Sequence, residues 1–258
     1  MMKVNFYKYQ GTGNDFVVID NRDGSYNDLS PILIEKLCNR KFGIGADGLM
    51  MLELQEGYDF RMVYYNADGQ EGSMCGNGGR CLVQFAHDRG IIKDHYSFMA
   101  MDGEHQAYIL DGRIYLKMQD VQQVERQGQV SILNTGSPHY VSFVEDVEGM
   151  DIYGEGRKIR YGNAYKDRGI NVNFVCPDKK GIRVRTYERG VENETLSCGT
   201  GVTASALAHA TNNGKQEISI KVEGGELAVS FNRIDDQHYE DIWLIGPAAF
   251  VYSGEINI

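Results

Sequence analysis

Proline, positive charge and long apolar runs are all scarce in this chain, and each scarcity excludes a class of protein. The 258 residues include only 4 prolines and no long polar tract, which argues against a disordered protein. No stretch approaches the roughly 18 apolar residues of a membrane span. The first residues show no basic segment followed by an apolar one, so we expect a cytoplasmic protein with neither a signal peptide nor a membrane partner.

Basic residues are outnumbered, since 26 Lys and Arg face 36 Asp and Glu and leave a net charge of -10. This negative charge disfavours a nucleic-acid partner. The cysteines number 5, an odd count that is typical of free thiols in a reducing compartment. No Cys-x-x-Cys or His-x-x-x-His pair occurs, so we expect no metal site.

Glycine is abundant, with 31 residues, and short strand-like runs recur along the whole chain. Asp111-Gly112 is typical of a hairpin turn between two of them. The predicted strands cover residues 6–9, 16–20, 60–65, 96–101, 106–110, 113–118, 130–133, 140–144, 172–175, 182–186, 218–222, 227–232 and 241–245. Helical patterns are fewer. Ser30-Pro31 is typical of a helix start and predicts a helix to about Arg40. Further helices are predicted after Cys75 to Gly90 and after Cys198 to about Gly214, with a weaker one over 151–161.

The two halves of the chain resemble a diverged duplication. Each half has a run of strand-like segments and one central helix that is introduced by Cys-Gly-x-Gly. A polar stretch over Gln119–Gly128 is the best boundary. We therefore predict an N-terminal lobe over 1–119, a C-terminal lobe over 120–247, and a last strand over 248–258 that returns to the first lobe.

Cys75 and Cys198 are the strongest candidates for chemistry. Each precedes a glycine-rich helix start, where unsatisfied N–H groups and the helix dipole favour the thiolate. Two such thiols, one from each half, suggest two acid/base groups that face one small substrate. The remaining cysteines lie within predicted helices or at the end of a strand, and we interpret them as small buried apolar residues: Cys38, Cys81 and Cys176.

Several polar residues in turn-like settings have both a structural and a functional interpretation. His139 follows the tight turn Gly136-Ser137-Pro138 and enters a strand, where it is placed to reach a site. Glu188-Arg189 is either a surface ion pair or a carboxylate beside a guanidinium that clamps a substrate carboxylate. Turn chemistry alone explains four asparagines, but together they are suited to a polar, zwitterionic ligand: Asn14, Asn66, Asn77 and Asn171.

Six segments, taken in order, resemble the diaminopimelate epimerase family, and the match runs essentially from end to end. They are Gly11–Asp20, Phe42–Gly48, Tyr65–Gly69, Met74–Cys81, Gly136–His139 and Glu188–Gly201. Related cofactor-independent racemases, such as proline racemase, share the fold and the two cysteines. The Asn14 loop, the Asn-Gly-Gly-Arg run after Cys75 and the Glu188-Arg189 pair are more similar to the diaminopimelate enzymes.

The resemblance implies an α+β fold of two pseudo-symmetric lobes, each a β-rich half-barrel around a central helix, with the active site in the cleft between them. It implies Cys75 and Cys198 as the catalytic acid/base pair, with His139 and Glu188 behind the thiols to tune their protonation. It also implies a homodimer, and we expect Tyr252, near the C-terminus, to be a contact. The implied substrate-binding residues are Asn14, Asn66, Gly76, Asn77, Ser137, Asn171, Glu188, Arg189, Gly199 and Thr200.

The implied roles differ among these residues. Gly76, Asn77, Gly199 and Thr200 offer backbone N–H groups to the reacting carboxylate, and Arg189 binds the distal one. The family often has asparagine where this chain has Ser137. Serine is shorter and has one donor instead of two, so we expect the distal carboxylate to be reached through water there.

The expected activity is interconversion of LL- and meso-diaminopimelate, for lysine and peptidoglycan precursors, with no cofactor. One thiolate removes the α-proton while the other thiol delivers a proton to the opposite face. A pyridoxal cofactor would need a Schiff-base lysine, and no lysine stands in a site-like context. Two alternatives remain open: another cofactor-independent racemase of this fold, acting on a different amino acid as proline racemase does, and a non-catalytic amino-acid-binding protein.

Overall fold

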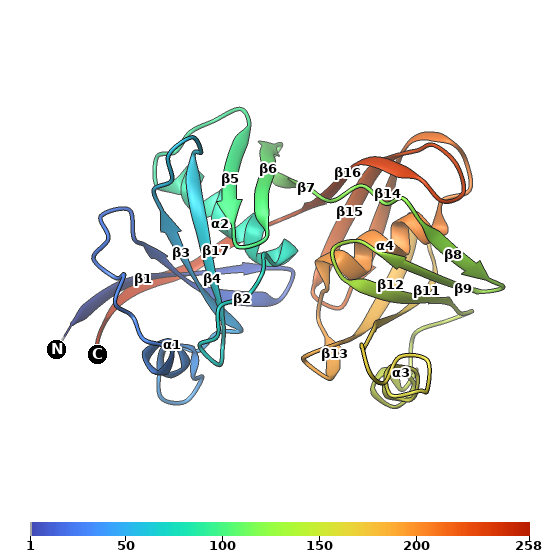
Figure 1. The fold of residues 1–258 in the computed structure, drawn as a ribbon, viewed down its shortest axis with the longest axis horizontal. Helices are drawn as coiled ribbons and strands as arrows, with labels where there is room; N and C mark the ends of the chain where they lie inside the picture. The colour runs from blue at the N-terminus through green and yellow to red at the C-terminus, as the bar shows by residue number, and fades with distance from the viewer. Residues whose placement is uncertain (1) are drawn as a thin grey trace. The chain divides into compact units, whose positions relative to one another are not determined.

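The computed structural model describes residues 2–258, which separate into two compact units. Unit 1 contains the chain up to Leu116 together with Pro247–Ile258, and unit 2 contains Lys117–Gly246. The chain therefore leaves unit 1 once, completes unit 2 and returns. Figure 1 shows this return as the red strand β17 beside the blue strand β1 in unit 1.

Unit 1 is a strongly bent sheet with two helices. Its strands follow the order β17-β1-β2-β3-β4-β5-β6-β7, and the helices α1 and α2 connect β2 to β3 and β4 to β5. The elements are β1 (Lys3–Gly11), β2 (Asn14–Asp20), α1 (Pro31–Cys38), β3 (Gly48–Glu53), β4 (Phe60–Asn66), α2 (Gly76–Asp88), β5 (Tyr96–Ala100), β6 (Gly103–Leu110), β7 (Arg113–Lys117) and β17 (Ala249–Asn257).

Unit 2 has the same plan. Its strands follow the order β8-β9-β10-β11-β12-β14-β15-β16, with the short β13 also paired to β12. The elements are β8 (Val124–Gln127), β9 (Val130–Asn134), β10 (Pro138–Phe143), α3 (Ile152–Arg160), β11 (Asn171–Asp178), β12 (Gly181–Glu188), β13 (Asn193–Thr195), α4 (Gly199–His209), β14 (Gly214–Val222), β15 (Gly225–Arg233) and β16 (Tyr239–Gly246).

The pairing pattern confirms the predicted duplication. In unit 1 the pairs β1–β2, β2–β3, β3–β4 and β4–β5 alternate between antiparallel and parallel. In unit 2 the pairs β9–β10, β10–β11, β11–β12 and β12–β14 alternate in the same way. A helix lies in each parallel connection, so α2 and α4 hold equivalent places. The predicted α+β class, with two pseudo-symmetric β-rich units around a central helix, is confirmed.

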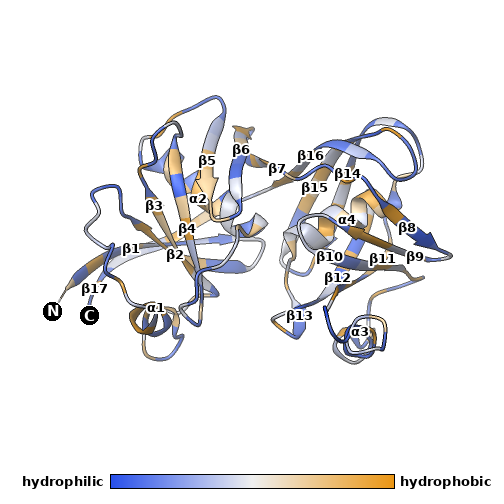
Figure 2. Cartoon of the chain, in the orientation of Figure 1, coloured by the Kyte–Doolittle hydropathy of each residue, from blue (hydrophilic) through white to orange (hydrophobic). Residues whose placement is uncertain are grey.

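The central helices form the middle of each core because they are apolar on several sides. α2 packs Leu82, Phe85 and Ala86 among the strands of unit 1, and α4 buries Val202 and Leu207 in unit 2. α4 is apolar on nearly all sides, and a helix of this kind is stable only when it is enclosed. Figure 2 shows hydrophobic colour on strands of both units, including β5 and β15. Within residues 2–258, no helix has the length and apolarity that crossing a membrane requires.

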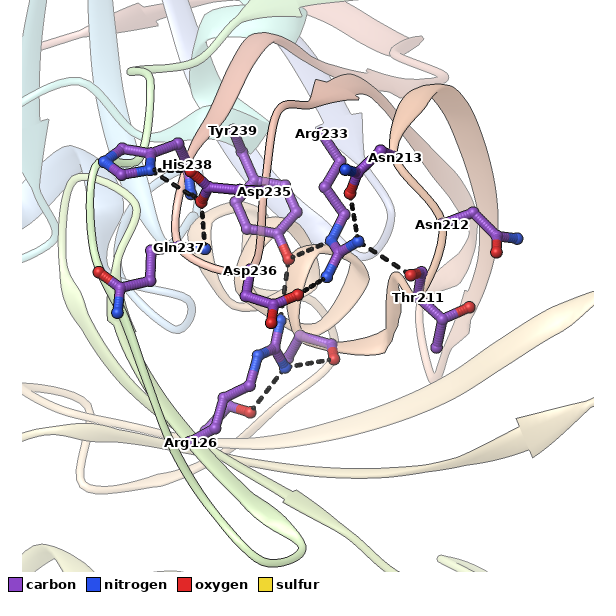
Figure 3. Close-up of polar contacts among 12 residues, drawn as sticks. Arg126, Thr211, Asn212, Asn213, Arg233, Asp235, Asp236, Gln237, His238 and Tyr239 are labelled. Atoms are coloured by element: carbon purple, nitrogen blue, oxygen red, sulfur yellow. Dashed lines mark hydrogen bonds and ion pairs between the residues drawn. The ribbon is translucent and has the colours of Figure 1, made fainter.

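A network of polar side chains caps the C-terminus of α4 (Figure 3). Arg126 donates to the carbonyl of Ala208 at 3.0 Å and to the Tyr239 hydroxyl at 2.8 Å. Arg233, only 6% exposed, donates to the carbonyl of Thr211 at 2.8 Å. Cations at a helix C-terminus oppose the negative end of its dipole and satisfy its last carbonyls. α4 is thus anchored at the end opposite Cys198.

The predicted helix starts are confirmed, and one predicted helix end is wrong. The Ser30 hydroxyl accepts from the N–H of Leu33, as an N-cap should. α3 spans Ile152–Arg160, within the predicted 151–161. α4 ends at His209 rather than near Gly214, because Ala210 is already extended, with φ -63° and ψ 131°, and leads toward β14.

Three strands are absent from the sequence prediction: β3, β8 and β13. β3 is Gly-Leu-Met-Met-Leu-Glu, and its four central residues are all buried. A strand that is covered on both faces has no alternating pattern for the sequence to show. β8 lies in the polar stretch that the sequence predicts as the boundary between the lobes, and β13 is only 3 residues long.

Candidate active site

Cys75 is the N-cap residue of α2 and has extended backbone angles, with φ -100° and ψ 129°. The first helical hydrogen bond runs from the Gly79 N–H to the Cys75 carbonyl at 2.7 Å. The N–H groups of the first turn therefore have no acceptor within the helix. The thiol does not cap them, because its side chain makes no cap hydrogen bond. An anion near Cys75 is met by these N–H groups and by the positive end of the helix dipole.

Asn14, one of the expected substrate-binding residues, lies beside this thiol. The Cys75 Sγ donates to Asn14 Oδ1 at 3.7 Å, and Asn77 Nδ2 donates to the same oxygen at 3.3 Å. On its other side, Asn14 Nδ2 donates to Asp47 Oδ2 at 2.6 Å. A carboxylate only accepts, so Asp47 fixes the orientation of the Asn14 amide and turns its oxygen toward Cys75.

Asp47 belongs to an ion-pair cluster that sequence reasoning missed. Arg40 bridges Asp47 at 2.7 Å and Asp15 at 2.6 Å, and Lys8 pairs with Asp15 at 2.7 Å. Burial would raise the pKa of Asp15, but hydrogen bonds from Arg40 and Lys8 outweigh it and hold that pKa well below its usual range. The cluster stiffens the loop that carries Asn14. The only signal in the sequence is the Gly-Ala-Asp-Gly turn that ends the second family-like segment.

Arg80 lies fully buried in the second turn of α2. Its guanidinium donates to the Gly76 carbonyl at 3.1 Å, Asn77 Oδ1 at 3.0 Å and Thr12 Oγ1 at 3.2 Å, and all three are neutral oxygens. Burial lowers the pKa of Arg80 to about 10, so the side chain stays charged at neutral pH. A buried cation with neutral acceptors is costly and raises the local potential.

Cys198 repeats the geometry of Cys75 in unit 2. It is the N-cap residue of α4, with φ -120° and ψ 110° and no cap hydrogen bond from its side chain. The Val202 N–H donates to its carbonyl at 2.9 Å. The sulfur lies 3.5 Å from the Thr200 hydroxyl, and the residue is only 7% exposed. Gly199 and Thr200 form the first turn, as predicted, and the Thr200 carbonyl accepts from Thr135 at 2.8 Å.

His139 is fully buried at the start of β10 and faces a polar side chain, Asn173, from the neighbouring strand β11. Its Nδ1 lies 3.1 Å from Asn173 Nδ2, and Asn173 Oδ1 accepts from Thr186 Oγ1 at 2.9 Å. Burial, and to a smaller extent the nearby charge of Arg189, lower the pKa of His139 to about 3. Sequence reasoning missed Asn173. Its signal was period 2 on a strand, which places Asn173 on the same face as Asn171.

Ser137, Asn171 and Arg189 form one cluster beside His139. Asn171 Nδ2 donates to Ser137 Oγ at 2.9 Å, and Asn171 Oδ1 accepts from the backbone N–H of Arg189 at 2.8 Å. The exposed Arg189 guanidinium donates to Ser137 Oγ at 3.3 Å and to the Arg168 carbonyl at 3.2 Å, both neutral acceptors. Asn171 thus orients the turn and Arg189, whose charge remains available to an anion.

Glu188 and Asn66 end equivalent strands in the two units. Glu188 closes β12, and its Oε2 accepts from Thr195 Oγ1 at 2.9 Å. Asn66 closes β4 and is exposed, with its backbone N–H bonded to the Gln70 carbonyl at 2.9 Å.

Within residues 2–258, no group of three or more His, Cys, Asp or Glu side chains is arranged to hold a metal ion.

A family model described as diaminopimelate epimerase matches residues 6–125 and 131–251. The chain belongs to the diaminopimelate epimerase family. A diaminopimelate epimerase from Flavobacterium psychrophilum is 50% identical over 254 residues, which cover 97% of this chain and 99% of that relative. A diaminopimelate epimerase from Chlorobaculum tepidum is 43% identical over 263 residues, which cover 96% of this chain and 99% of that relative. By this membership the chain is an isomerase of the epimerase type.

Solved structures of other proteins share the fold of this epimerase family member. A PhzF-family phenazine biosynthesis protein from Bacillus anthracis superposes with a TM-score of 0.77 at 14% identity and covers 100% of both chains. A probable proline racemase from Agrobacterium radiobacter gives a TM-score of 0.65 at 14% identity, with 99% of this chain and 92% of that chain covered. At this identity the likeness concerns the fold.

Apart from Asn66, which closes β4, the predicted site residues fall into one group in each unit. In unit 1 the structure brings Asn14, Cys75, Gly76 and Asn77 together at the start of α2. In unit 2 the predicted residues lie at the start of α4 and at the ends of the strands β10–β12: Ser137, His139, Asn171, Glu188, Arg189, Cys198, Gly199 and Thr200.

Proposed function

We propose that the protein interconverts LL- and meso-diaminopimelate, with Cys75 and Cys198 as the two acid/base groups. The observation that carries this proposal is that both cysteines are N-cap residues of enclosed helices whose first turns are opened by glycine. Neither thiol is used to cap its helix, so each is placed to exchange a proton beside an anion-binding helix terminus. The 50% identity to a named diaminopimelate epimerase supports the substrate assignment.

The chemical problem is that an amino-acid α-proton is very weakly acidic. In the proposed reaction one thiolate takes the proton from the α-carbon and the other thiol gives its proton to the opposite face, so the charge of the protein is unchanged. Negative charge that develops on the substrate carboxylate is stabilised by the first-turn N–H groups: Gly76 and Asn77 in α2, and Gly199 and Thr200 in α4. Stabilisation of this kind is usually the largest single contribution to such a rate.

The remaining predicted residues have proposed roles that agree with their contacts. Arg189 binds the distal carboxylate, because its guanidinium is exposed and donates only to neutral oxygens. Asn66 and Asn14 bind polar groups of the substrate, and Asn171 with Ser137 positions Arg189. Glu188 and His139 act on the protonation or charge of the reacting groups. These assignments place the protein in lysine and peptidoglycan-precursor biosynthesis.

The test is solvent-deuterium uptake by diaminopimelate, compared with a panel that includes alanine and proline. We expect uptake at the α-carbon of diaminopimelate and little with the short amino acids. Cys75→Ala and Cys198→Ala should each lose on the order of 10²–10⁴-fold in turnover, because each face needs its own proton carrier. Circular dichroism checks that both variants are folded.

Two results would contradict the proposal in different ways. Equal uptake by proline or alanine would favour a general racemase of this fold. Near-wild-type turnover in either folded cysteine variant would exclude the mechanism with two thiols.

We further propose that the enzyme works as a cytoplasmic homodimer that associates through β17. Phe250, Val251 and Tyr252 of this strand are 51%, 52% and 43% exposed, an apolar run that a second copy would cover. Analytical ultracentrifugation of wild type and Tyr252→Glu tests this. A monomeric wild type would rule the dimer out.

A further inference from the structure

His139 carries a buried polar atom with no partner. Its Nε2 is one of two buried side-chain nitrogen or oxygen atoms within residues 2–258 that have no hydrogen-bond partner. Buried polar atoms in proteins nearly always have one, so an exception at a proposed site residue needs an explanation. The explanation comes from the opposite side of the ring.

The other ring nitrogen, Nδ1, faces an amide whose orientation is fixed. Asn173 Nδ2 lies 3.2 Å from the Tyr140 carbonyl, which can only accept a hydrogen bond. The amide oxygen of Asn173 accepts from Thr186 Oγ1 at 2.9 Å. Asn173 therefore presents its NH₂ group, and not its oxygen, to His139 Nδ1 at 3.1 Å.

The strand register keeps this arrangement in place. Asn173 on β11 is directly opposite Thr186 on the antiparallel β12 and beside Val141 on the parallel β10. Asn173 is fully buried and Thr186 is 3% exposed, so water does not compete for these bonds. The amide is held on three sides and cannot turn without breaking a buried hydrogen bond.

The same amide lies against the helix that carries Cys198. A Cβ atom built on Gly201 would be 2.4 Å from Asn173 Oδ1 and 3.3 Å from Cys198 Sγ. Asn173 thus occupies the space that a side chain at position 201 would need. Asn173, the middle member of the series Thr186–Asn173–His139, is therefore packed directly against the first turn of α4.

The protonation of His139 follows from its neighbours. Because an N–H group points at Nδ1, this nitrogen must supply its lone pair, and the ring proton must be on Nε2. An imidazolium would place an Nδ1–H against the Asn173 N–H. The nearby cationic side chain, Arg189, also opposes a positive ring, and burial acts in the same direction.

We propose that Asn173, held by Thr186, is a positioning residue that keeps His139 neutral with its proton on Nε2, so that His139 serves as a hydrogen-bond donor to an anion formed or bound during the reaction. This inference rests on the proposed function, in which His139 belongs to the site. His139 neither takes a proton from a thiol nor gives one up. The α-proton passes to one thiolate, the returning proton comes from the other thiol, and the imidazole only donates a hydrogen bond.

The primary test is ¹⁵N NMR of histidine-labelled wild-type protein, which reports the tautomer without any substitution. His139 is assigned by comparison with His139→Gln. We expect a neutral ring with Nε2–H throughout the range of about pH 5 to 8 in which an unperturbed histidine titrates. An Nδ1–H ring, or a ring that becomes imidazolium within this range, would overturn the proposal whatever the activity of the enzyme.

Variants connect the tautomer to catalysis. Asn173→Asp replaces the donor at Nδ1 by an acceptor, so His139 should move its proton to Nδ1 or become charged, and kcat should fall on the order of 10²-fold. Asn212→Asp adds the same charge in an exposed segment before β14 and should change neither the spectrum nor kcat. Wild-type kcat in a folded Asn173→Asp protein with an altered tautomer would refute the catalytic part.

Substitutions at Thr186 provide a second route if Asn173→Asp does not fold. Thr186→Val removes the hydroxyl that holds the Asn173 oxygen and should broaden or shift the His139 signal, whereas Thr186→Ser keeps the hydroxyl and should restore it. Unchanged spectra and kcat in Thr186→Val would contradict the positioning role of this residue pair.

The acceptor of the Nε2–H is either a thiolate or the substrate carboxylate, and the same spectra distinguish them. If the acceptor is a thiolate, the Nε2–H signal moves in Cys75→Ala or Cys198→Ala without substrate. If it is the carboxylate, the signal moves only when diaminopimelate is added to these inactive variants. No movement in any arm would refute the donor role. Failure of diaminopimelate turnover in wild type would instead refute the proposed function and leave the tautomer unaffected.

Discussion

Gly201→Ala is the substitution for which the structure gives the sharpest expectation. Gly201 is the third residue of α4, where alanine would by itself favour the helix by about 1 kcal/mol. Its Cβ, however, would lie 2.4 Å from Asn173 Oδ1, which is closer than any real contact. Asn173 cannot retreat easily, because Thr186, Tyr140 and His139 hold it.

Two costs oppose the gain in helix propensity. Overpacking a filled interior costs about 1–3 kcal/mol. Loss of the bond from Thr186 to Asn173 leaves a buried hydroxyl unpaired, at about 1–3 kcal/mol. We therefore expect Gly201→Ala to lower the free energy of unfolding by roughly 1–5 kcal/mol in urea titrations, and to lower kcat because the amide beside Cys198 is displaced.

Gly78→Ala is the matched control, since Gly78 is the third residue of α2. Its Cβ would meet Met50 Sδ at 3.1 Å and the ends of Met62 and Phe16 at 3.5 Å. A thioether adapts to small changes in packing, so stability should stay within about 1 kcal/mol of wild type. If Gly201→Ala is as stable and active as Gly78→Ala, Asn173 is not held as described.

Two further predictions concern charged side chains. Arg189→Lys should lower kcat/KM for diaminopimelate by roughly 10- to 1000-fold in steady-state assays, because lysine cannot form the two parallel hydrogen bonds of a guanidinium; an unchanged value would exclude the distal clamp. Asp15→Asn should lower the free energy of unfolding at pH 7 by roughly 1–3 kcal/mol, since the pKa of Asp15 is depressed in the folded protein by Arg40 and Lys8 against the effect of burial. That contribution is present above the unfolded pKa, near 4, and is lost as pH falls through the folded one, so the two proteins should converge in acid.

The parts of the fold that the sequence predicted are those with local signals. Ser30-Pro31 predicts the start of α1, because serine is a favoured N-cap residue and proline fits the first helical position. The N–H that proline lacks would have no acceptor within the helix there. Asp111-Gly112 predicts the turn of the β6–β7 hairpin, and both residues have the positive φ that such a turn requires, 51° and 72°. β3 was missed because burial on both faces removes the alternation that reveals a strand.

In the candidate site, residue type and motif predict the two thiols. They do not predict Asn173 and Asp47, the side chains that orient His139 and Asn14. Asn173 is one residue in a strand of mixed pattern, and only its register opposite Thr186 shows that its amide is fixed. Asp47 follows a glycine turn, and its bond to Asn14 joins residues 33 positions apart. Such contacts depend on tertiary placement, so a single sequence cannot reveal them.

The two central helices differ in one respect that predicts different chemistry for the two thiols. Arg80 and Thr203 lie five residues after Cys75 and Cys198, and both are fully buried. Each donates to the carbonyl four residues earlier, Arg80 to Gly76 at 3.1 Å and Thr203 to Gly199 at 2.9 Å. The two positions are therefore structurally equivalent, and the positive charge at Arg80 is the difference between them.

A buried cation whose acceptors are neutral stabilises any anion that forms near it, so Arg80 should favour the Cys75 thiolate. The test is alkylation of each cysteine across pH, resolved by peptide mass spectrometry. Arg80→Met should move the midpoint pH for Cys75 upward by about one unit and leave that for Cys198 in place. Arg80→Lys keeps the charge and should move the Cys75 midpoint less than Arg80→Met does. Equal shifts at both cysteines would indicate a general loss of structure, and no shift at Cys75 would show that the buried charge does not act on this thiol.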